Sequence, residues 1–309
     1  MKKTFLFLAF ACVAMLFSSC NKEGVFNPKK KISKIYTSNS HTSNGNTTLD
    51  RWLQEEWTWN KNNTLAKIDH HFGAYENTET YTYDNKKRVV RIDGTTTNIW
   101  DNNYTYHIEF KYNGKELSEA AYYDEDELQT KLVFTHEKGK ISKIELFEMD
   151  MENMDKHIKA LHSLLPEHLY SNLEKMYKNR LSKSNAKGDA TIIWELSWDK
   201  DNVSKAVCTA KWIEGYEKDI MEYKYDSYNN PFYGYLSPEM GEYAGADYFS
   251  KNNITQIKTQ FLTSNPDDEG STYISNYAYT YEGKYPISSS YTESSGQTST
   301  TYTTEYEYK

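Results

Sequence analysis

Apolar and polar residues alternate with a period of two along most of this chain, in short runs that end on an aromatic residue. Residues 57–59 (Trp-Thr-Trp) and 81–83 (Tyr-Thr-Tyr) are two such strand ends. This alternation places both rings on one face of a β-strand. A polar turn follows, and then two apolar residues three positions apart, as expected for the return strand of a hairpin.

The same unit recurs through the chain. Its strand-end residue lies at positions 59, 83, 112, 135, 198, 225, 249 and 281. The pentapeptide Lys-Ile-Ser-Lys-Ile occurs at 31–35 and 140–144 as a return strand whose isoleucines are the apolar pair. The pattern predicts an all-β fold, a repetitive antiparallel meander of roughly 16 to 18 strands that forms a curled or partly closed sheet. A β-propeller, with a period of about 40 to 45 residues, is the alternative.

One interval between strand ends, from 135 to 198, contains a stretch with helical periodicity. Met154, Ile158 and Leu161 recur at spacings of four and three, as on one face of a helix. Pro166 is well placed to start a second helix. We therefore expect a helical hairpin inserted at about 150–185, packed on one face or one mouth of the sheet.

The N-terminus resembles a bacterial lipoprotein signal. A basic start precedes the apolar run 5–17, which is shorter than the roughly 20 residues that cross a bilayer but typical of a secretory signal. Small residues then precede Cys20, as in a lipobox. The resemblance implies cleavage before Cys20 and acylation of its thiol, and an ordinary signal peptide with a chance cysteine is the alternative.

These features divide the chain into three parts. We predict a lipoprotein signal peptide at 1–19, a lipidated linker at 20–29 and a single β-hairpin domain at 30–309 that includes the insertion. The hairpin pattern continues on both sides of the insertion, which is why 30–309 is treated as one domain. With Cys20 acylated, Cys208 is the one cysteine left for the mature chain, so no intrachain disulfide is expected.

Composition limits the class of partner. The chain has 28 tyrosines and 15% aromatic residues, yet its mean hydropathy is −0.86. Tyrosine combines an apolar ring with a polar tip, which suits strands that are only half buried. The formal charge of −8 at pH 7 argues against a nucleic-acid partner, because nucleic-acid binding uses a basic face.

The hairpin units resemble YD-repeats, in which a Tyr-x-Tyr-Asp strand end meets a polar turn. Residues 81–89 (YTYDNKKRV) and 223–232 (YKYDSYNNPF) carry the likeness. Most units lack the glycine of the Gly-Arg that follows in that pattern. With the lipobox, they resemble a group of Bacteroidetes lipoproteins without an assigned activity. The resemblance implies a repetitive β fold and a Gram-negative outer-membrane address, on either the periplasmic or the outer side.

Few residues match a catalytic or metal-binding pattern. His157, His162 and His168 are spaced by five and six, whereas helical ligand pairs are spaced by three or four. The adjacent His70 and His71 point to opposite faces of a strand and cannot readily chelate one ion. We therefore expect no metal and no cofactor, and we assign no catalytic residue.

Four tryptophans form the candidate binding platform. Trp57, Trp59, Trp194 and Trp198 recur at equivalent strand ends on either side of the insertion. Tyrosine and tryptophan are enriched at contact surfaces. The alternative is that these rings are the packing of the sheet itself, through cross-strand pairs.

The leading functional interpretation is a non-catalytic envelope lipoprotein that binds a protein or a glycan through a sheet face. The membrane, reached through the lipid, is its other expected partner. A structural spacer of the envelope is the first alternative. A glycan hydrolase is a further alternative, and it would require two carboxylates that converge on a glycosidic bond.

Overall fold

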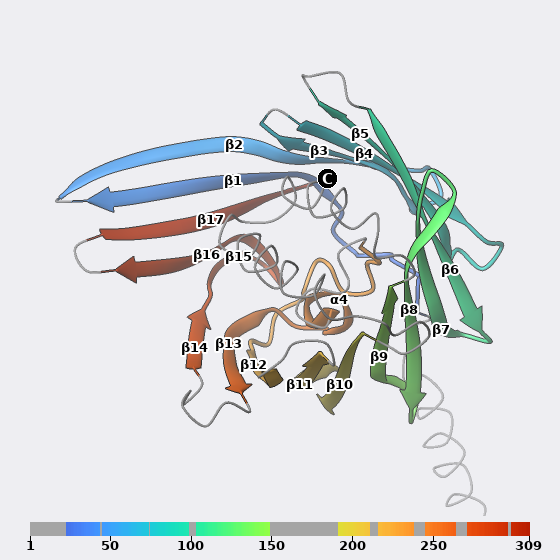
Figure 1. Cartoon of the computed structure of the whole chain (residues 1–309). Helices are drawn as coiled ribbons and strands as arrows, with labels where there is room; N and C mark the ends of the chain where they lie inside the picture. The colour runs from blue at the N-terminus through green and yellow to red at the C-terminus, as the bar shows by residue number, and fades with distance from the viewer. Residues whose placement is uncertain are drawn as a thin grey trace, which may run out of the picture.

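Figure 1 shows a computed structural model of the chain. It describes residues 23–43, 45–73, 75–98, 103–148, 191–210, 216–237, 245–263, 271–295 and 298–309. These residues form one antiparallel sheet of 17 strands, which confirms the predicted all-β meander. The signal peptide, Cys20 and the helical hairpin predicted at 150–185 lie outside the described residues.

The strands follow one another in chain order. They are β1 (Ile32–Ser43), β2 (Asn46–Trp59), β3 (Leu65–Phe72), β4 (Tyr75–Tyr83), β5 (Val89–Asn98), β6 (Tyr104–Asn113), β7 (Glu116–Asp124), β8 (Glu127–Glu137), β9 (Lys140–Glu148), β10 (Ile192–Asp199), β11 (Asn202–Ala210), β12 (Tyr216–Tyr225), β13 (Ile254–Thr263), β14 (Ser271–Asn276), β15 (Ala278–Glu282), β16 (Tyr285–Ser295) and β17 (Thr298–Tyr308). A short helix, α4 (Ala246–Phe249), lies between β12 and β13.

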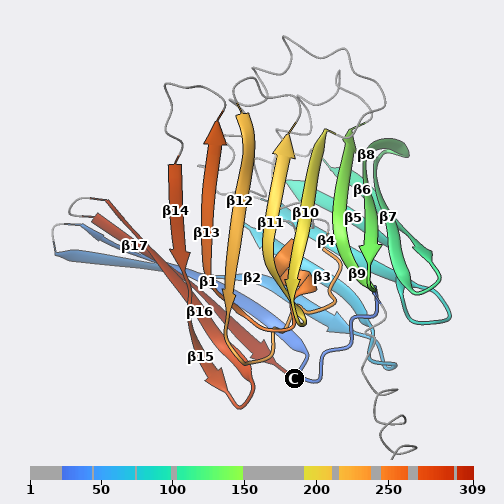
Figure 2. The ribbon, with the colours of Figure 1, turned by 90° about the horizontal axis from the view of Figure 1, so that it is seen from below.

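The sheet curls until its two ends meet. Consecutive strands pair from β1 to β14, β15 pairs with β16, β16 with β17, and β17 returns to β1. Tyr277 joins β14, which pairs with β13, to β15, which pairs with β16. The result is a nearly closed barrel (Figures 1 and 2), in agreement with the expected curled or partly closed sheet.

A β-bulge occurs at the same place in successive hairpins. The strand-end aromatic faces the first apolar residue of the return strand, and the register shifts at that pair: Tyr83 lies opposite Val89, and Trp59 opposite Leu65. The same shift recurs in β6–β7, β8–β9, β10–β11, β12–β13 and β15–β16. A bulge removes one residue from the regular ladder, which frees a carbonyl for another donor.

That donor is the polar tip of the next strand-end aromatic. The Tyr83 hydroxyl donates to the carbonyl oxygen of Leu65 at 2.8 Å, and the Tyr112 hydroxyl donates to that of Val89 at 2.6 Å. Tyr225, Trp59 and Trp198 make the same bond to the carbonyls of Val203, Ile32 and Ile141. Each of these five units is therefore bonded to the one before it, which explains why their strand ends carry tyrosine or tryptophan.

The two copies of Lys-Ile-Ser-Lys-Ile take equivalent places in this arrangement. Their four isoleucines are at most 4% exposed. The leading lysines, Lys31 and Lys140, lie over the rings of Trp59 and Trp198 at 5.6 and 5.1 Å from the ring centroids. The repeated pentapeptide is thus one structural element, a return strand covered by the tryptophan of the next unit.

One end of the barrel, here called the floor, is filled by two segments. The floor is the end at which the strand-end aromatics lie, and the opposite end is the far rim. The connection from β12 to β13, described at 226–237 and 245–253 and called the plug, packs against the floor together with residues 23–30. The Phe26 ring lies 5.4 Å from that of Tyr235 in the plug and 6.1 Å from that of Trp57 in the wall. The hydrophobic core is therefore concentrated at the floor.

The outward face of the barrel wall carries pairs of opposite charge. Lys111 lies 2.7 Å from Glu119, and Lys143 lies 3.0 Å from Glu145. Inward positions hold the apolar and aromatic residues of the core. This distribution suits a wall that faces water, since an outer face in contact with lipid tails is apolar.

Candidate functional site

The structure places the four predicted platform tryptophans in or beside the core. Trp57 and Trp194 are 4% and 5% exposed. Trp59 and Trp198 are half-buried, and each indole N–H donates to an isoleucine carbonyl. The ring faces of Trp57 and Trp194 are covered by neighbouring side chains, so the placement supports sheet packing, and a binding role for the four stays a prediction.

The described residues begin three positions after Cys20. Within them, no helix is long and apolar enough to cross a membrane. Nor does this part of the chain contain a group of three or more His, Cys, Asp or Glu residues placed to hold a metal ion. His70 and His71 do point to opposite faces: His70 faces Glu55 and Glu79 inside the barrel, whereas His71 lies 3.8 Å from Glu56 on the outer face.

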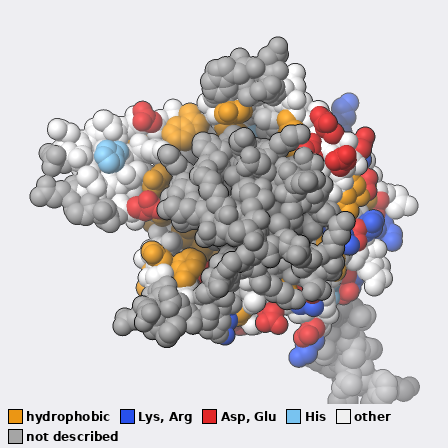
Figure 3. Space-filling view, in the orientation of Figure 1, with side chains coloured by type: hydrophobic (Ala, Val, Ile, Leu, Met, Phe, Trp, Pro, Cys, Tyr) orange, Lys and Arg blue, Asp and Glu red, His pale blue; other side chains and the backbone are white. Residues whose placement is uncertain are grey.

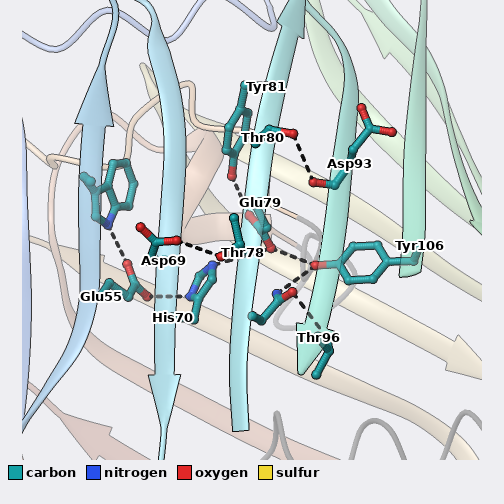
Figure 4. A network of polar contacts seen from close by, with 12 residues as sticks. Glu55, Asp69, His70, Thr78, Glu79, Thr80, Tyr81, Asp93, Thr96 and Tyr106 are labelled. Carbon is teal, nitrogen blue, oxygen red and sulfur yellow. Dashed lines mark hydrogen bonds and ion pairs between the residues drawn. The ribbon is translucent and has the colours of Figure 1, made fainter. Parts of the chain in front are cut away.

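A polar network surrounds His70 inside the barrel (Figure 4). Nδ1 of His70 lies 3.6 Å from Glu55 Oε1 on β2, and Nε2 lies 3.5 Å from Glu79 Oε1 on β4. Glu79 also accepts hydrogen bonds from the hydroxyls of Tyr81 at 2.6 Å and Tyr106 at 3.0 Å. One imidazole ring therefore lies between two carboxylates from the neighbouring strands.

The network extends from the wall to the plug. The Tyr81 hydroxyl lies 2.7 Å from the Tyr235 hydroxyl of the plug. On the other side, the amide of Asn77 donates to the Tyr106 hydroxyl at 2.9 Å, and the Trp57 indole N–H donates to a Glu55 carboxylate oxygen at 2.6 Å. Side chains from β2, β3, β4 and β6 are thereby connected to the segment that fills the floor.

Gly94 on β5 allows the Tyr106 hydroxyl to reach Glu79 on β4. It lies opposite Tyr106 in the β5–β6 register. A Cβ atom at Gly94 would lie 2.1 Å from Cζ of the Tyr106 ring. The absence of a side chain lets that ring lie across β5 and bring its hydroxyl to Glu79.

The charges of the network favour one protonation state. Burial lowers the pKa of His70, but the carboxylates of Glu79 and Glu55 outweigh burial and raise that pKa well above the usual 6.5. Burial raises the pKa of Glu79, but His70 and the hydroxyls of Tyr81 and Tyr106 outweigh it and lower that pKa. Imidazolium and carboxylate therefore stabilise each other at neutral pH.

This arrangement fits an internal ion pair better than an acid–base catalyst. A general base works best when its pKa lies near the working pH. A raised pKa keeps His70 protonated and a lowered pKa keeps Glu79 ionised, so neither exchanges a proton readily near neutrality. The two carboxylates converge on His70, and the network connects wall and plug.

A second candidate lies where four strands extend beyond the barrel. Residues 36–54 of β1 and β2 and residues 288–305 of β16 and β17, here called the arm, project from one side of the barrel (Figures 1 and 2). Residues 46–52 are all exposed, and residues 298–306 are all half-buried. A covered sheet face would give alternating burial, so both faces meet solvent along these two stretches, whereas Ser38 on β1 is buried.

Polar cross-strand pairs hold the arm in place of a core. The guanidinium of Arg51 lies 2.8 Å from Glu305 Oε2 and 4.0 Å from the centroid of the Tyr36 ring. On the opposite face, the rings of Tyr291 and Tyr302 stack with their centroids 4.8 Å apart. Such pairs stabilise a sheet by about 0.2–1 kcal/mol each.

Among the described residues, no strand pairs with the outer edge of β2 along the arm. Residues 46–54 pair with β1 on one side, whereas the ladder with β3 on the other side begins at Glu55. Two large apolar side chains stand on this stretch, Leu49 at 66% and Trp52 at 39% exposure. Asp50 and Arg51 lie between them. Leu49 and Arg51 therefore share one face of the edge strand, and Asp50 and Trp52 share the other.

Comparison with solved structures finds porin-like proteins among the similar chains. A porin-like protein from Bacteroides uniformis is similar at 12% identity and a TM-score of 0.45, over 93% of this chain and 100% of that one. A porin-like protein from Bacteroides vulgatus is similar at 7% identity and a TM-score of 0.34, over 91% and 99%. No family model and no curated protein matches the sequence. Identities and TM-scores this low assign no role to any residue here.

Proposed function

We propose that this chain is a non-catalytic binding module of the cell envelope, held to the membrane through an acylated Cys20, and that it binds a protein partner along the arm. The observation that carries the proposal is the open edge of β2 at 46–54. The arm adds surface and costs chain entropy without enlarging the core. A function located on the arm accounts for its retention.

The chemistry of the edge fits an extended segment of another protein. An unpaired strand edge presents backbone N–H and C=O groups that a partner strand can continue, and side chains on the two faces then give specificity. Leu49 and Trp52 supply apolar contacts on opposite faces. Asp50 and Arg51 supply opposite charges beside them.

A glycan partner is the second candidate, and the stacked rings of Tyr291 and Tyr302 favour it. They lie on one face of the arm, on the adjacent strands β16 and β17. A sugar would lie on the face of the arm, whereas a peptide strand would add to its edge. The two candidates therefore depend on different residues.

Site-specific photo-crosslinking in envelope membranes tests the proposal. A photoreactive residue replaces Asp50 on the open edge of the full-length lipoprotein, and the matched control replaces Glu195, an exposed residue of the wall strand β10. We expect a defined protein adduct from position 50, lost when Leu49→Lys and Trp52→Lys are added, and none from position 195. Equal adducts at both positions, or none at either, would contradict it.

A glycan array with the same chain separates the remaining interpretations. If glycan binding is lost in Tyr302→Ala but retained in Leu49→Lys/Trp52→Lys, the binding site lies on the face of the arm and not on its edge. Absence of both adducts and glycan binding would favour a spacer.

A further inference from the structure

The turns at the floor carry a ring of lysines. The strands on either side of each turn bring its residues to the same end of the barrel, the lower edge in Figure 2. We call the following exposed residues the lysine ring: Lys61, Lys86, Lys87, Lys115, Lys138, Lys200, Lys251 and Lys284. The chain as a whole is acidic, so this end differs in charge from the rest of the molecule.

Turn geometry does not account for the choice of lysine. Lys87, Lys138 and Lys200 have φ of 63°, 53° and 51°, a left-handed conformation that favours Gly or Asn. At the far rim, the turn from β7 to β8 places Glu125 and Asp126 at positive φ instead. The same backbone conformation thus carries basic side chains at one end of the barrel and acidic side chains at the other.

Figure 3 views the molecule from the far rim and shows acidic side chains gathered on the side of the β7–β8 hairpin. The floor turns and their strand ends also contain carboxylates, namely Asp84, Glu116, Glu137, Asp199, Asp201, Asp226 and Glu282, and Glu23 of the N-terminal segment lies at the same end. Asp84 is paired with Arg88 at 2.7 Å and Glu282 with Lys30 at 2.8 Å, and neither base belongs to the ring. One ion pair of the ring joins Lys251 to Asp201 at 3.2 Å. The eight lysines of the ring still outnumber the six carboxylates that Arg88 and Lys30 leave at the floor, so this end keeps an excess of positive charge.

The N-terminal segment is fixed to the same end. The backbone N–H of Leu117 donates to the Glu23 carboxylate at 2.6 Å, and Nε2 of His136 lies 2.9 Å from it. The N–H of Val89 donates to the Gly24 carbonyl at 3.0 Å. Three residue steps separate Glu23 from Cys20, and extended chain covers at most about 3.6 Å per step. A lipid on Cys20 would thus hold the floor within about 11 Å of the bilayer surface.

We propose that the lysine ring lies against the anionic headgroups of the membrane that anchors the chain, so that the barrel stands floor-down. The orientation depends on the proposed lipid anchor at Cys20. The affinity of the lysine ring for anionic lipid is a property of the folded chain alone. Each lysine close to an anionic surface strengthens binding by about fivefold. The far rim then faces away from the membrane, and the arm extends to the side, open to a partner.

Vesicle co-sedimentation of the unlipidated chain from Asn21, which contains every described residue, tests the ring separately from the anchor. We expect binding to vesicles of phosphatidylglycerol and phosphatidylcholine at low salt, little binding to phosphatidylcholine alone, and loss of binding at high salt. The floor variant combines Lys61→Gln, Lys86→Gln, Lys138→Gln and Lys200→Gln. The wall variant combines Lys67→Gln, Lys111→Gln, Lys143→Gln and Lys258→Gln, with the same change in net charge.

The floor variant should bind anionic vesicles about 100-fold or more weakly, and the wall variant should bind within about threefold of the original chain. Both should keep the circular dichroism spectrum and melting temperature of the original chain within a few degrees. Equal loss in the two variants, equal binding to both kinds of vesicle, or no binding to anionic vesicles at low salt would each overturn the proposal. Palmitate labelling of the full chain, abolished by Cys20→Ser, tests the anchor itself and does not depend on this outcome.

Discussion

Four strands of this molecule run through two different environments. The floor halves of β1 and β2 hold Ile32, Ile35 and Trp57 in the core, whereas the arm halves of the same strands expose Leu49 and Trp52. The β1–β2 pairing continues from one environment to the other, with one register shift between Ile35 and Tyr36. The comparison teaches that sheet formation needs the ladder and its cross-strand pairs, while burial is required only where the core lies. Residues in the arm are therefore free to serve a partner.

The largest expected contrast lies within β2, between Trp57 and Trp52. Trp57→Ala removes a buried ring and leaves Glu55 without the indole donor, so we expect a loss of about 3–5 kcal/mol in the free energy of unfolding. Trp52→Ala changes a side chain exposed in the arm, and we expect a change of about 0.5 kcal/mol or less. Urea unfolding midpoints at constant m-value measure both. Similar losses from the two variants would mean that the arm is as buried as the core.

A second contrast sets a buried ion pair against an exposed one. Glu79→Ala leaves His70 as a buried cation without its main partner, which costs about 3–5 kcal/mol. Glu305→Ala removes the partner of Arg51 in the arm, where exposed pairs contribute about 0–1 kcal/mol. Thermal unfolding of the two variants at pH 6 checks the difference. An equal effect would show that Glu79 is not desolvated.

The pH dependence of stability follows from the same pair. The pKa of His70 in the folded chain is raised above 6.5. Its contribution to the free energy of unfolding is therefore complete below pH 6.5 and is lost as the pH rises through the folded pKa. Because the folded pKa of Glu79 is lowered from 4.5, its contribution is full above pH 4.5 and is lost as pH falls. Between pH 6.5 and 9 the melting temperature should therefore fall, and Glu79→Gln should flatten the slope. A steeper slope in that variant would contradict the assignment.

The smallest contrast compares two hydroxyl groups. Tyr83→Phe removes the bond to the Leu65 carbonyl and leaves a buried acceptor without this donor, so we expect a loss of about 1–2 kcal/mol. Thr292→Val removes a hydroxyl that pairs with Thr301 at 2.8 Å in the solvated arm, where we expect about 0.5 kcal/mol or less. Chemical denaturation of both variants provides the measurement. An unchanged free energy of unfolding in Tyr83→Phe would show that the bond between neighbouring units does not stabilise the fold.

The repeat itself could be predicted because it is local. Alternation and turn residues placed Ile141 and Ile144 on a return strand, and both are buried as expected. The same alternation places Trp57 and Trp194 on the face of the strand-end rings, and both side chains are at most 5% exposed. Their burial supports the sheet-packing alternative, and the binding platform stays a prediction.

The interior network was missed for two different reasons. The signal for Glu55 and Glu79 was present, because each lies two residues before an inward aromatic and so has inward parity. The partner in the plug could not be inferred, because Tyr235 is 154 positions from Tyr81 and only the folded connection brings it there. Likewise, the need for Gly94 is visible only once the Tyr106 ring lies across it.

Amide hydrogen exchange along β2 tests the comparison most directly. The strand is continuous from Asn46 to Trp59, so differences within it report environment and not a change of element. We predict strong protection at 55–59, which pair with β3 beside the core. We predict fast exchange at the amides of 46–54 that point to the open edge. Uniform protection along the whole strand would contradict the claim that the arm is an open, solvated extension of the barrel.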